Sequence, residues 1–159
     1  MMNLEAKTSA LRMFQYGLLV VTARHREDAV ASTVTWATQC SFDPPLVVVA
    51  VKRGTRTFDV VRAAGAFAIN VIGAGQQEIA SMFFKHVGIE GGKIGGLPFT
   101  TGVTGSPILA GLPGYLECKV IEFIDRGDHP LFLAEVVEAG VQNSLLPLVL
   151  RDTGWSYGG

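Results

Sequence analysis

Charged residues are scarce in this sequence, and neither sign dominates. They make up 17% of the 159 residues, and the formal net charge is −1. A chain so close to neutral has no general electrostatic attraction to nucleic acid or to an anionic membrane. No apolar run approaches the roughly 20 residues that a membrane-spanning helix needs. Residues 1–15 also lack the apolar stretch and cleavage signal of a secretory peptide, so we expect no targeting segment.

Cysteine is equally rare, and its placement excludes several kinds of site. Cys40 and Cys118 form no CxxC pair and have no histidine at metal-binding spacing. The sequence also has no nucleophile elbow and no pair of carboxylates at useful spacing. Hydrolase and metalloenzyme functions therefore have no support, and we expect no metal site. A reducing cytoplasm is the expected location.

Apolar residues and glycine are abundant: 48% of the chain is apolar, and 19 residues are glycine. This composition and length predict a single domain over residues 1–159 with a sizeable core. Helical spacing and capping signals predict helices over 3–15, 55–65 and 76–84. β-Branched runs bounded by turn residues predict strands at 17–23, 29–37, 45–51 and 66–73, a hairpin of 114–125 with 129–142, and a last strand within 146–158. Glycine-rich residues 85–113 are expected to form an irregular loop.

Many short strands and few helices predict a mainly β fold with short helices. The hairpin spacing favours a closed or nearly closed antiparallel barrel whose ends the helices cover. The segment "VIGAGQQE" superficially matches a dinucleotide-binding fingerprint. It lacks the third glycine and has no βαβ alternation around it, so we interpret it as a strand-to-helix turn.

Three segments carry candidate chemistry. Residues 31–41 alternate hydroxyl and apolar side chains, which indicates either a strand with one wet face or a ligand contact. "VKRGTRT" opens a helix with cations and hydroxyls and suits a phosphate, although on this segment alone a threonine cap among solvated basic residues is favoured. His129 follows Asp128 at a strand start, where it either meets a ligand or is a solvated turn residue. Such a barrel, with few acid–base groups, suits a cofactor that carries the chemistry itself.

Taken in order, these segments resemble the flavin reductase-like family, which folds as an FMN-binding split β-barrel, antiparallel and Greek-key-like. The resemblance covers nearly the whole chain and is nearest to the branch of flavoredoxin and the flavin domains of high-molecular-weight rubredoxins. A pyridoxamine-phosphate-oxidase-like split barrel is a neighbouring alternative, against which "SFDPP" and "GDH" argue. The segments that carry the resemblance are "YGLLVVTA", "STVTWATQCSFDPPLVVVAV", "TRTFDVVRAAGAFAINVI", "QQEIASMFF", "GYLECKV" and "GDHPLFLAEV".

The resemblance implies where a flavin would bind. Residues 33–41 would line its ring and ribityl chain, and the stretch that starts at Lys52 would bind its phosphate, which reverses the interpretation from that segment alone. The implied catalytic residue is His129, near the flavin and its nicotinamide donor. The implied cofactor-binding residues are Thr33, Thr35, Trp36, Ala37, Thr38, Gln39, Cys40, Ser41, Lys52, Arg53, Thr55, Thr57, Asn70 and Phe84. Trp36 departs from the family, which often has a small hydroxyl residue there.

The implied function is an FMN-binding oxidoreductase, with FAD as a possible alternative flavin. It would be an NAD(P)H-dependent flavin reductase, with NADH or NADPH as electron donor and a separate electron acceptor or flavin-using partner. The resemblance also implies a homodimer with the flavin near the interface. The alternative is a flavoredoxin-type FMN electron carrier without its own NAD(P)H reductase activity. An unliganded structural dimer is a third and less favoured hypothesis.

Overall fold

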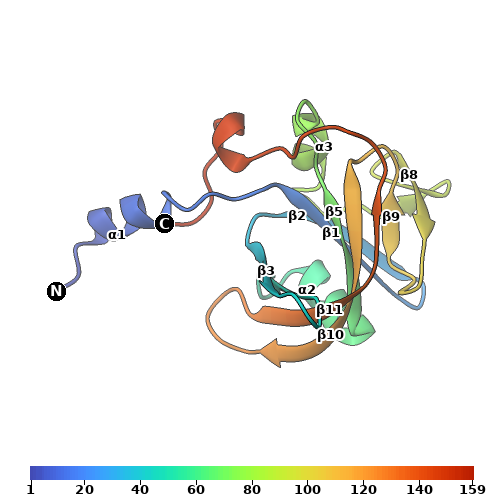
Figure 1. The fold of residues 1–159 in the computed structure, drawn as a ribbon, viewed down its shortest axis with the longest axis horizontal. Helices are drawn as coiled ribbons and strands as arrows, with labels where there is room; N and C mark the ends of the chain where they lie inside the picture. The colour runs from blue at the N-terminus through green and yellow to red at the C-terminus, as the bar shows by residue number, and fades with distance from the viewer.

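The computed structural model describes all 159 residues, and its main element is a seven-stranded antiparallel sheet (Figure 1). Its strand order is β2-β1-β5-β10-β11-β4-β3. These strands are β1 (Leu19–His25), β2 (Asp28–Val34), β3 (Ala37–Ser41), β4 (Leu46–Ala50), β5 (Ala66–Val71), β10 (Gly114–Ile124) and β11 (Leu131–Val141). The fold is therefore mainly β and antiparallel, as the strand pattern predicts.

The chain order forces this sheet to curl. β2 and β3 lie at its opposite edges, yet only Thr35 and Trp36 separate them in the sequence. A link of two residues spans about 10 Å at full extension, so the two edges must approach each other at this point. The result is a barrel with an opening at residues 35–36.

The barrel interior holds the larger apolar cluster, which includes Val21, Val49, Phe67 and Phe132. Their strands place β-branched and aromatic side chains on the inner face, the arrangement that fills small barrels. A second cluster, with Phe83 and Leu112 among its members, packs between the barrel and the segments that cover one side of it.

Helix α2 (Arg56–Ala64) packs against β1, β2 and β5. It begins at Thr55, whose hydroxyl accepts a hydrogen bond from the Phe58 amide at 3.2 Å. It ends at Gly65, whose φ of 64° is a left-handed conformation that glycine adopts without strain. Both ends match the capping signals in the sequence.

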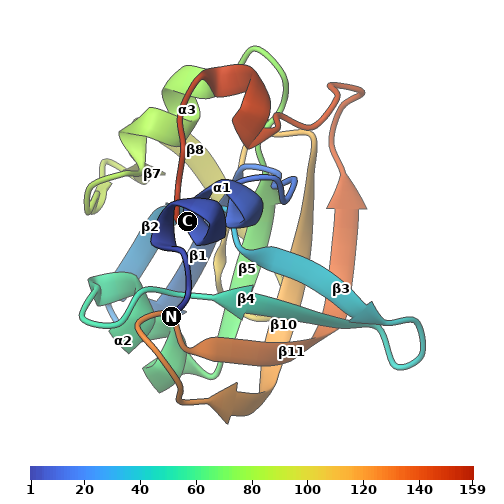
Figure 2. The same ribbon diagram turned by 90° about the vertical axis from the view of Figure 1, so that its left-hand side faces the viewer.

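The other helices differ in how they pack. α3 (Gln77–Met82) lies beside the 3₁₀ helix η1 (Leu150–Thr153), and the Gln77 side chain donates to the Thr153 carbonyl at 3.1 Å (Figure 2). α1 (Leu4–Leu11) has no buried residue and projects from the barrel. The expectation that the helices cover the barrel ends is therefore wrong for α1. None of the helices is long and apolar enough to cross a membrane.

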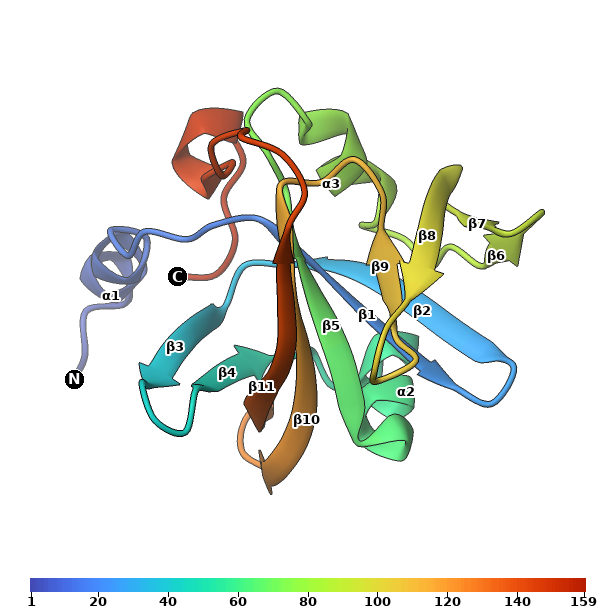
Figure 3. The same cartoon turned by 45° about the vertical axis from the view of Figure 1, so that its right-hand side comes forward.

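Residues 85–113 are not the irregular loop that the glycine content predicts. They form a four-stranded sheet of β6 (Ile89–Glu90), β7 (Lys93–Ile94), β8 (Leu97–Thr101) and β9 (Pro107–Leu109), on the opposite side of the barrel from α1 (Figure 3). These strands are too short for an alternating pattern to emerge from the sequence. The fully buried carboxylate of Glu117 helps to order the turn after β8, because it accepts from the backbone amides of Val103 and Thr104 at 3.1 and 2.8 Å.

Two further expectations need correction. The strand predicted over 29–37 breaks at residues 35–36, where the chain passes between the edges of the barrel. The strand predicted within 146–158 is reduced to two isolated bridges, Gly17 with Val149 and Gly73 with Pro147, followed by η1. Gly154 ends η1 with a φ of 76°, and the aromatic residues after it turn back toward the barrel opening.

Candidate active site

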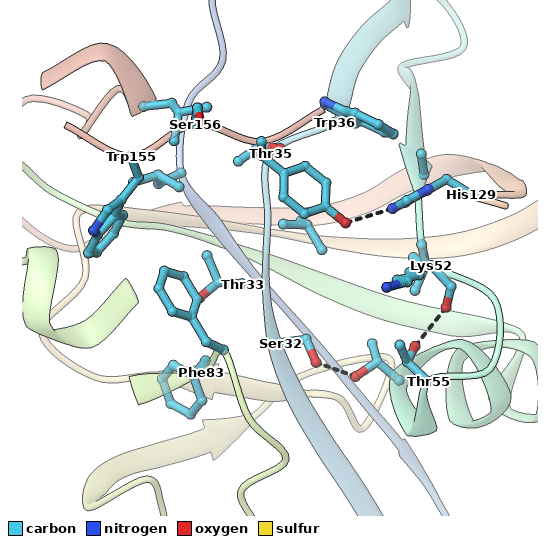
Figure 4. Close-up of a pocket in the computed structure, with 18 residues that line it drawn as sticks. Ser32, Thr33, Thr35, Trp36, Lys52, Thr55, Phe83, His129, Trp155 and Ser156 are labelled. Carbon is cyan, nitrogen blue, oxygen red and sulfur yellow. Dashed lines mark hydrogen bonds between the residues drawn. The ribbon is translucent and has the colours of Figure 1, made fainter. Parts of the chain in front are cut away.

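A cavity of about 590 Å³ lies at the barrel opening (Figure 4). This volume is within the usual range for sites that bind small molecules. Its walls come from distant parts of the chain: the end of β2 with residues 35–36, the end of β4 with the start of α2, the end of α3, and residues 155–157. The closing of the barrel therefore assembles the cavity.

One side of the cavity is suited to an anion. Lys52 follows β4 and lines the cavity together with Thr55 and Thr57 from the start of the nine-residue α2. Ser32 of β2 lies beside them, and its hydroxyl is hydrogen-bonded to that of Thr57 (Figure 4). The Thr55 hydroxyl is already used, since it donates to the Lys52 carbonyl at 2.8 Å, but the Lys52 ammonium, the Thr57 hydroxyl and the positive end of the helix dipole together favour a phosphate.

Arg53 does not join this group, although it is next to Lys52. Its guanidinium forms an ion pair with Asp125 and also donates to the Gly127 carbonyl at 3.3 Å. The hydrogen bond from Arg53 holds the pKa of the Asp125 carboxyl below its usual value. Arg53 therefore braces the β10–β11 turn and does not line the cavity.

The middle of the cavity wall has polar atoms without partners. Thr35 is only 8% exposed, and its hydroxyl has no hydrogen-bond partner; the indole Nε1 of Trp36 is buried and unpartnered as well. Buried polar groups are nearly always hydrogen-bonded, so these two unpaired groups on consecutive residues are places where a ligand would supply the missing partners, after a local shift that uncovers them. A polar ligand with an anionic group suits this wall and the Lys52 side.

The third side is built around His129, which precedes β11. Its Nδ1 is 2.7 Å from an Asp128 carboxylate oxygen, and its Nε2 is 2.7 Å from the Tyr157 hydroxyl. Trp36 packs against the imidazole with ring centroids 4.6 Å apart. The hydrogen bond from His129 lowers the pKa of the Asp128 carboxyl, whereas burial and then the charge of Asp128 raise the pKa of the Tyr157 phenol.

The structure brings together eight of the predicted site residues in the cavity wall: Thr33, Thr35, Trp36, Lys52, Thr55, Thr57, Phe84 and His129. Seven others lie outside it. Arg53 is described above, and Ala37, Thr38, Gln39, Cys40 and Ser41 form β3, which runs away from the opening.

Asn70 is the seventh and lies inside the barrel. It is fully buried, and its amide donates to the Val20 carbonyl and the Thr22 hydroxyl at 3.3 and 3.1 Å, while its oxygen accepts from the Leu109 amide at 2.8 Å. Asn70 thus joins β1, β5 and β9, and every one of its contacts is internal to the protein.

Sequence reasoning missed Ser32 and the aromatic segment of Trp155, Ser156 and Tyr157. Trp155 packs on Phe84 with ring centroids 4.9 Å apart, edge to face. The available signal was the aromatic pair after "RDTG", because two aromatic rings in a short polar segment need a surface to cover. The sequence held no indication of which surface that is.

Comparisons with known proteins identify relatives of this chain. A "probable flavin reductase" of Rhizobium meliloti (strain 1021) is 28% identical over 97% of this chain and 47% of that protein. The "flavin-dependent monooxygenase, reductase subunit HsaB" of Mycobacterium tuberculosis is 30% identical over 76% of this chain and 63% of that protein. The chain thus spans about half to two thirds of the length of these curated relatives.

A solved structure and a family model complete the comparison. The "NADH:FAD oxidoreductase SgcE6" of Streptomyces globisporus superimposes with a TM-score of 0.79 at 27% identity, covering 94% of this chain and 90% of that one. The model of the flavin reductase like domain matches residues 11–157, from the end of α1 to the tyrosine that contacts His129. The chain belongs to the flavin reductase-like domain family.

Proposed function

We propose that this chain is an NAD(P)H-dependent flavin reductase that binds FMN in the cavity at the barrel opening. The observation that carries the proposal is the pairing of a phosphate-type site at Lys52 with the unpartnered hydroxyl of Thr35 in one cavity. Both features suit a molecule with a planar polar ring at one end and a phosphate at the other. The relatives named above, called flavin reductases or a reductase subunit, support the same conclusion.

The residues divide by the part of the cofactor they would hold. Lys52 and Thr57 would bind the phosphate, while Thr33, Thr35 and Trp36 would contact the ring and its chain. Bound FMN would supply an acceptor for hydride from NADH or NADPH. The chain's own contribution is to bind and orient both molecules and to exclude water from the space between them. FAD remains the alternative flavin, in keeping with the name of the Streptomyces globisporus protein.

The electrons taken from the nicotinamide donor would go to a separate acceptor. The Mycobacterium tuberculosis relative is named as the reductase subunit of a flavin-dependent monooxygenase, so a flavin-using oxygenase is the partner class we propose. The two free cysteines, Cys40 and Cys118, fit a reducing cytoplasm.

We also propose a homodimer, because the exposed α1 region carries apolar side chains that nothing in one copy covers. Leu4, Leu11 and Phe14 are 67%, 41% and 63% exposed. A second copy packed on this face would bury them and would lie beside the cavity opening, since Lys7 of α1 and Arg12 directly after it contact residues 159 and 158. Sedimentation at several concentrations, with Leu11→Asp as the disrupting variant, tests this assembly.

The central experiment measures flavin binding and reduction separately. FMN is titrated into the protein by fluorescence quenching, and the complex is then mixed anaerobically with NADH or NADPH. Binding followed by loss of the oxidised flavin absorbance supports the reductase. A flavin that binds but stays oxidised with both donors supports the electron-carrier alternative, and no binding of FMN or FAD refutes both.

Lys52 and Arg53 provide a matched pair for the phosphate site. Lys52→Ala removes a cation from the cavity and should weaken FMN binding roughly tenfold, the value of one charge-assisted hydrogen bond. Arg53→Ala removes an adjacent cation that faces Asp125, and FMN affinity should change less than about twofold. Equal losses in the two variants would mean a general charge effect and would remove Lys52 from the site.

A further inference from the structure

Residues 155–159 are held over the barrel opening by contacts from distant parts of the chain. Arg12 donates to the Gly158 carbonyl at 3.1 Å, and Lys7 donates to the Gly159 carbonyl at 3.2 Å. Gly158 has a φ of 79°, and a Cβ there would lie 2.5 Å from Cζ2 of Trp36. Only glycine fits this close approach with this backbone conformation. These contacts after Tyr157, together with the packing of Trp155 on Phe84 before it, fix where the Tyr157 ring lies.

The hydrogen bonds of His129 leave its ring with no free polar atom. An imidazole has two nitrogens, and here Nδ1 faces Asp128 while Nε2 faces the Tyr157 hydroxyl, each at 2.7 Å. The His129 side chain is also only 14% exposed. A ligand that enters the cavity cannot bond to His129 without first displacing Tyr157.

The Tyr157 hydroxyl, by contrast, keeps spare capacity. A phenol has one donor and two acceptor positions, and the bond to His129 uses only one of them. When Tyr157 donates to Nε2, its oxygen still accepts; when a protonated His129 donates to it, its O–H is free to donate. Tyr157 is 44% exposed and lines the cavity, so the residue is open to a ligand that binds there.

Tyr157 also lies between two hollows. A second hollow of about 440 Å³ shares Trp36, His129 and Tyr157 with the main cavity and has Lys7 in its wall. Trp36 and Tyr157 contact edge to face with centroids 5.2 Å apart, so the shared wall is aromatic. A molecule that binds in the second hollow meets the proposed flavin site at Tyr157.

We propose that Tyr157, and not His129, is the residue that bonds to the nicotinamide donor. Its hydroxyl would bind the carboxamide of the nicotinamide, which offers both an N–H donor and a carbonyl acceptor. His129 and Asp128 are then positioning residues that hold the phenol in place. This assignment rests on the proposed function, because it takes the main cavity as the flavin site.

The test is a double-mutant cycle on donor binding. The variants are Tyr157→Phe, His129→Ala and the two combined, each titrated with NAD⁺ in the presence of saturating FMN. NAD⁺ does not reduce FMN, so this measures binding without turnover. Each single substitution should weaken NAD⁺ binding roughly three- to tenfold, the range of one hydrogen bond. The double variant should be no weaker than the single ones, because both remove the same contact.

Two controls separate this effect from others. The affinity for FMN should change less than about twofold in Tyr157→Phe, because phenylalanine keeps the ring that packs on Trp36. Tyr115→Phe removes a phenol from β10, outside both hollows, and should leave NAD⁺ binding unchanged. Melting curves of all variants identify any that fail to fold, and His129→Gln replaces His129→Ala if the alanine variant does.

Two results would overturn the assignment. Multiplied losses in the double variant would mean that His129 contacts the donor by itself. Unchanged or tighter NAD⁺ binding in Tyr157→Phe would mean that the phenol is a bystander or a competitor. If the wild-type protein binds and reduces FMN, the proposed function stands whichever of these results is found. The assignment of Tyr157 and the proposed function can therefore fail independently.

Discussion

Thr35→Val should change stability and flavin affinity in opposite directions. Valine has almost the shape of threonine, so the substitution removes one hydroxyl and leaves the packing of the barrel edge in place. In the free protein that hydroxyl is buried and unpartnered. In the proposed complex it bonds to the flavin.

The expected changes in stability and in flavin affinity follow from these two environments of the Thr35 hydroxyl. A buried hydroxyl without a partner costs about 1–3 kcal/mol in proteins. Thr35 is 8% exposed and borders the cavity, so we take the lower end, a gain of about 1 kcal/mol in the free energy of unfolding. For a chain of 159 residues this raises the melting temperature by about 2–4 °C. The lost hydrogen bond to flavin should weaken binding roughly fivefold, equivalent to about 1 kcal/mol.

Urea unfolding of flavin-free protein measures the first effect, and fluorescence titration with FMN measures the second. Thr33→Val is the matched control for the unfolding measurement alone, because the Thr33 hydroxyl already donates to the Ala80 carbonyl at 2.8 Å and its loss should lower stability. A Thr35→Val protein that is clearly less stable would show that its hydroxyl has a partner. An unchanged affinity for FMN, FAD and riboflavin would exclude Thr35 from the flavin site. Either result refutes the reasoning.

The remaining predictions concern two interior groups. Asn70→Ala leaves the buried Leu109 amide without an acceptor and opens a cavity, so it should cost about 2–4 kcal/mol in urea unfolding. FMN affinity measured well below the unfolding midpoint should stay within about twofold of wild type, and a specific loss of affinity would return Asn70 to the cofactor site. Burial and the nearby Glu117 raise the pKa of the Cys118 thiol to about 12, so it stays protonated up to strongly alkaline pH. A thiol reagent at neutral pH should therefore label only the exposed Cys40 in native protein and both cysteines in urea, and Cys40→Ser should abolish native labelling.

The sequence predicted the parts of the fold that local chemistry determines. α2 is a clear example, because its Thr55 cap, apolar face and Gly65 end lie within eleven residues and match the structure. The small sheet of β6 to β9 could not be predicted in this way. Its order depends partly on the Glu117 carboxylate, which reaches Val103 and Thr104 from a different strand.

The candidate site likewise has parts that the local sequence determines and parts that it does not. Lys52, Thr55 and Thr57 lie together because one strand end and one helix start place them there, and a local motif predicts that arrangement. Asn70 occupies a strand that runs close to the site, but the direction in which a strand residue points depends on its register in the sheet. Tyr157 is 28 residues from His129 in sequence, and no local pattern joins them.

The position of the site follows from the topology of the barrel. An antiparallel sheet leaves unpaired backbone groups at its edges, and proteins cover or pair such edges. Here the edge at β2 is partly covered by the end of α3, since the Thr33 amide donates to the Phe83 carbonyl at 3.1 Å. Beyond Thr33 the chain leaves β2 for β3, and at Thr35 and Trp36 it retains buried polar atoms that no part of the protein satisfies. A ligand bound there would complete the barrel as well as serve the reaction, so flavin binding should raise the stability of the whole domain along with filling the site.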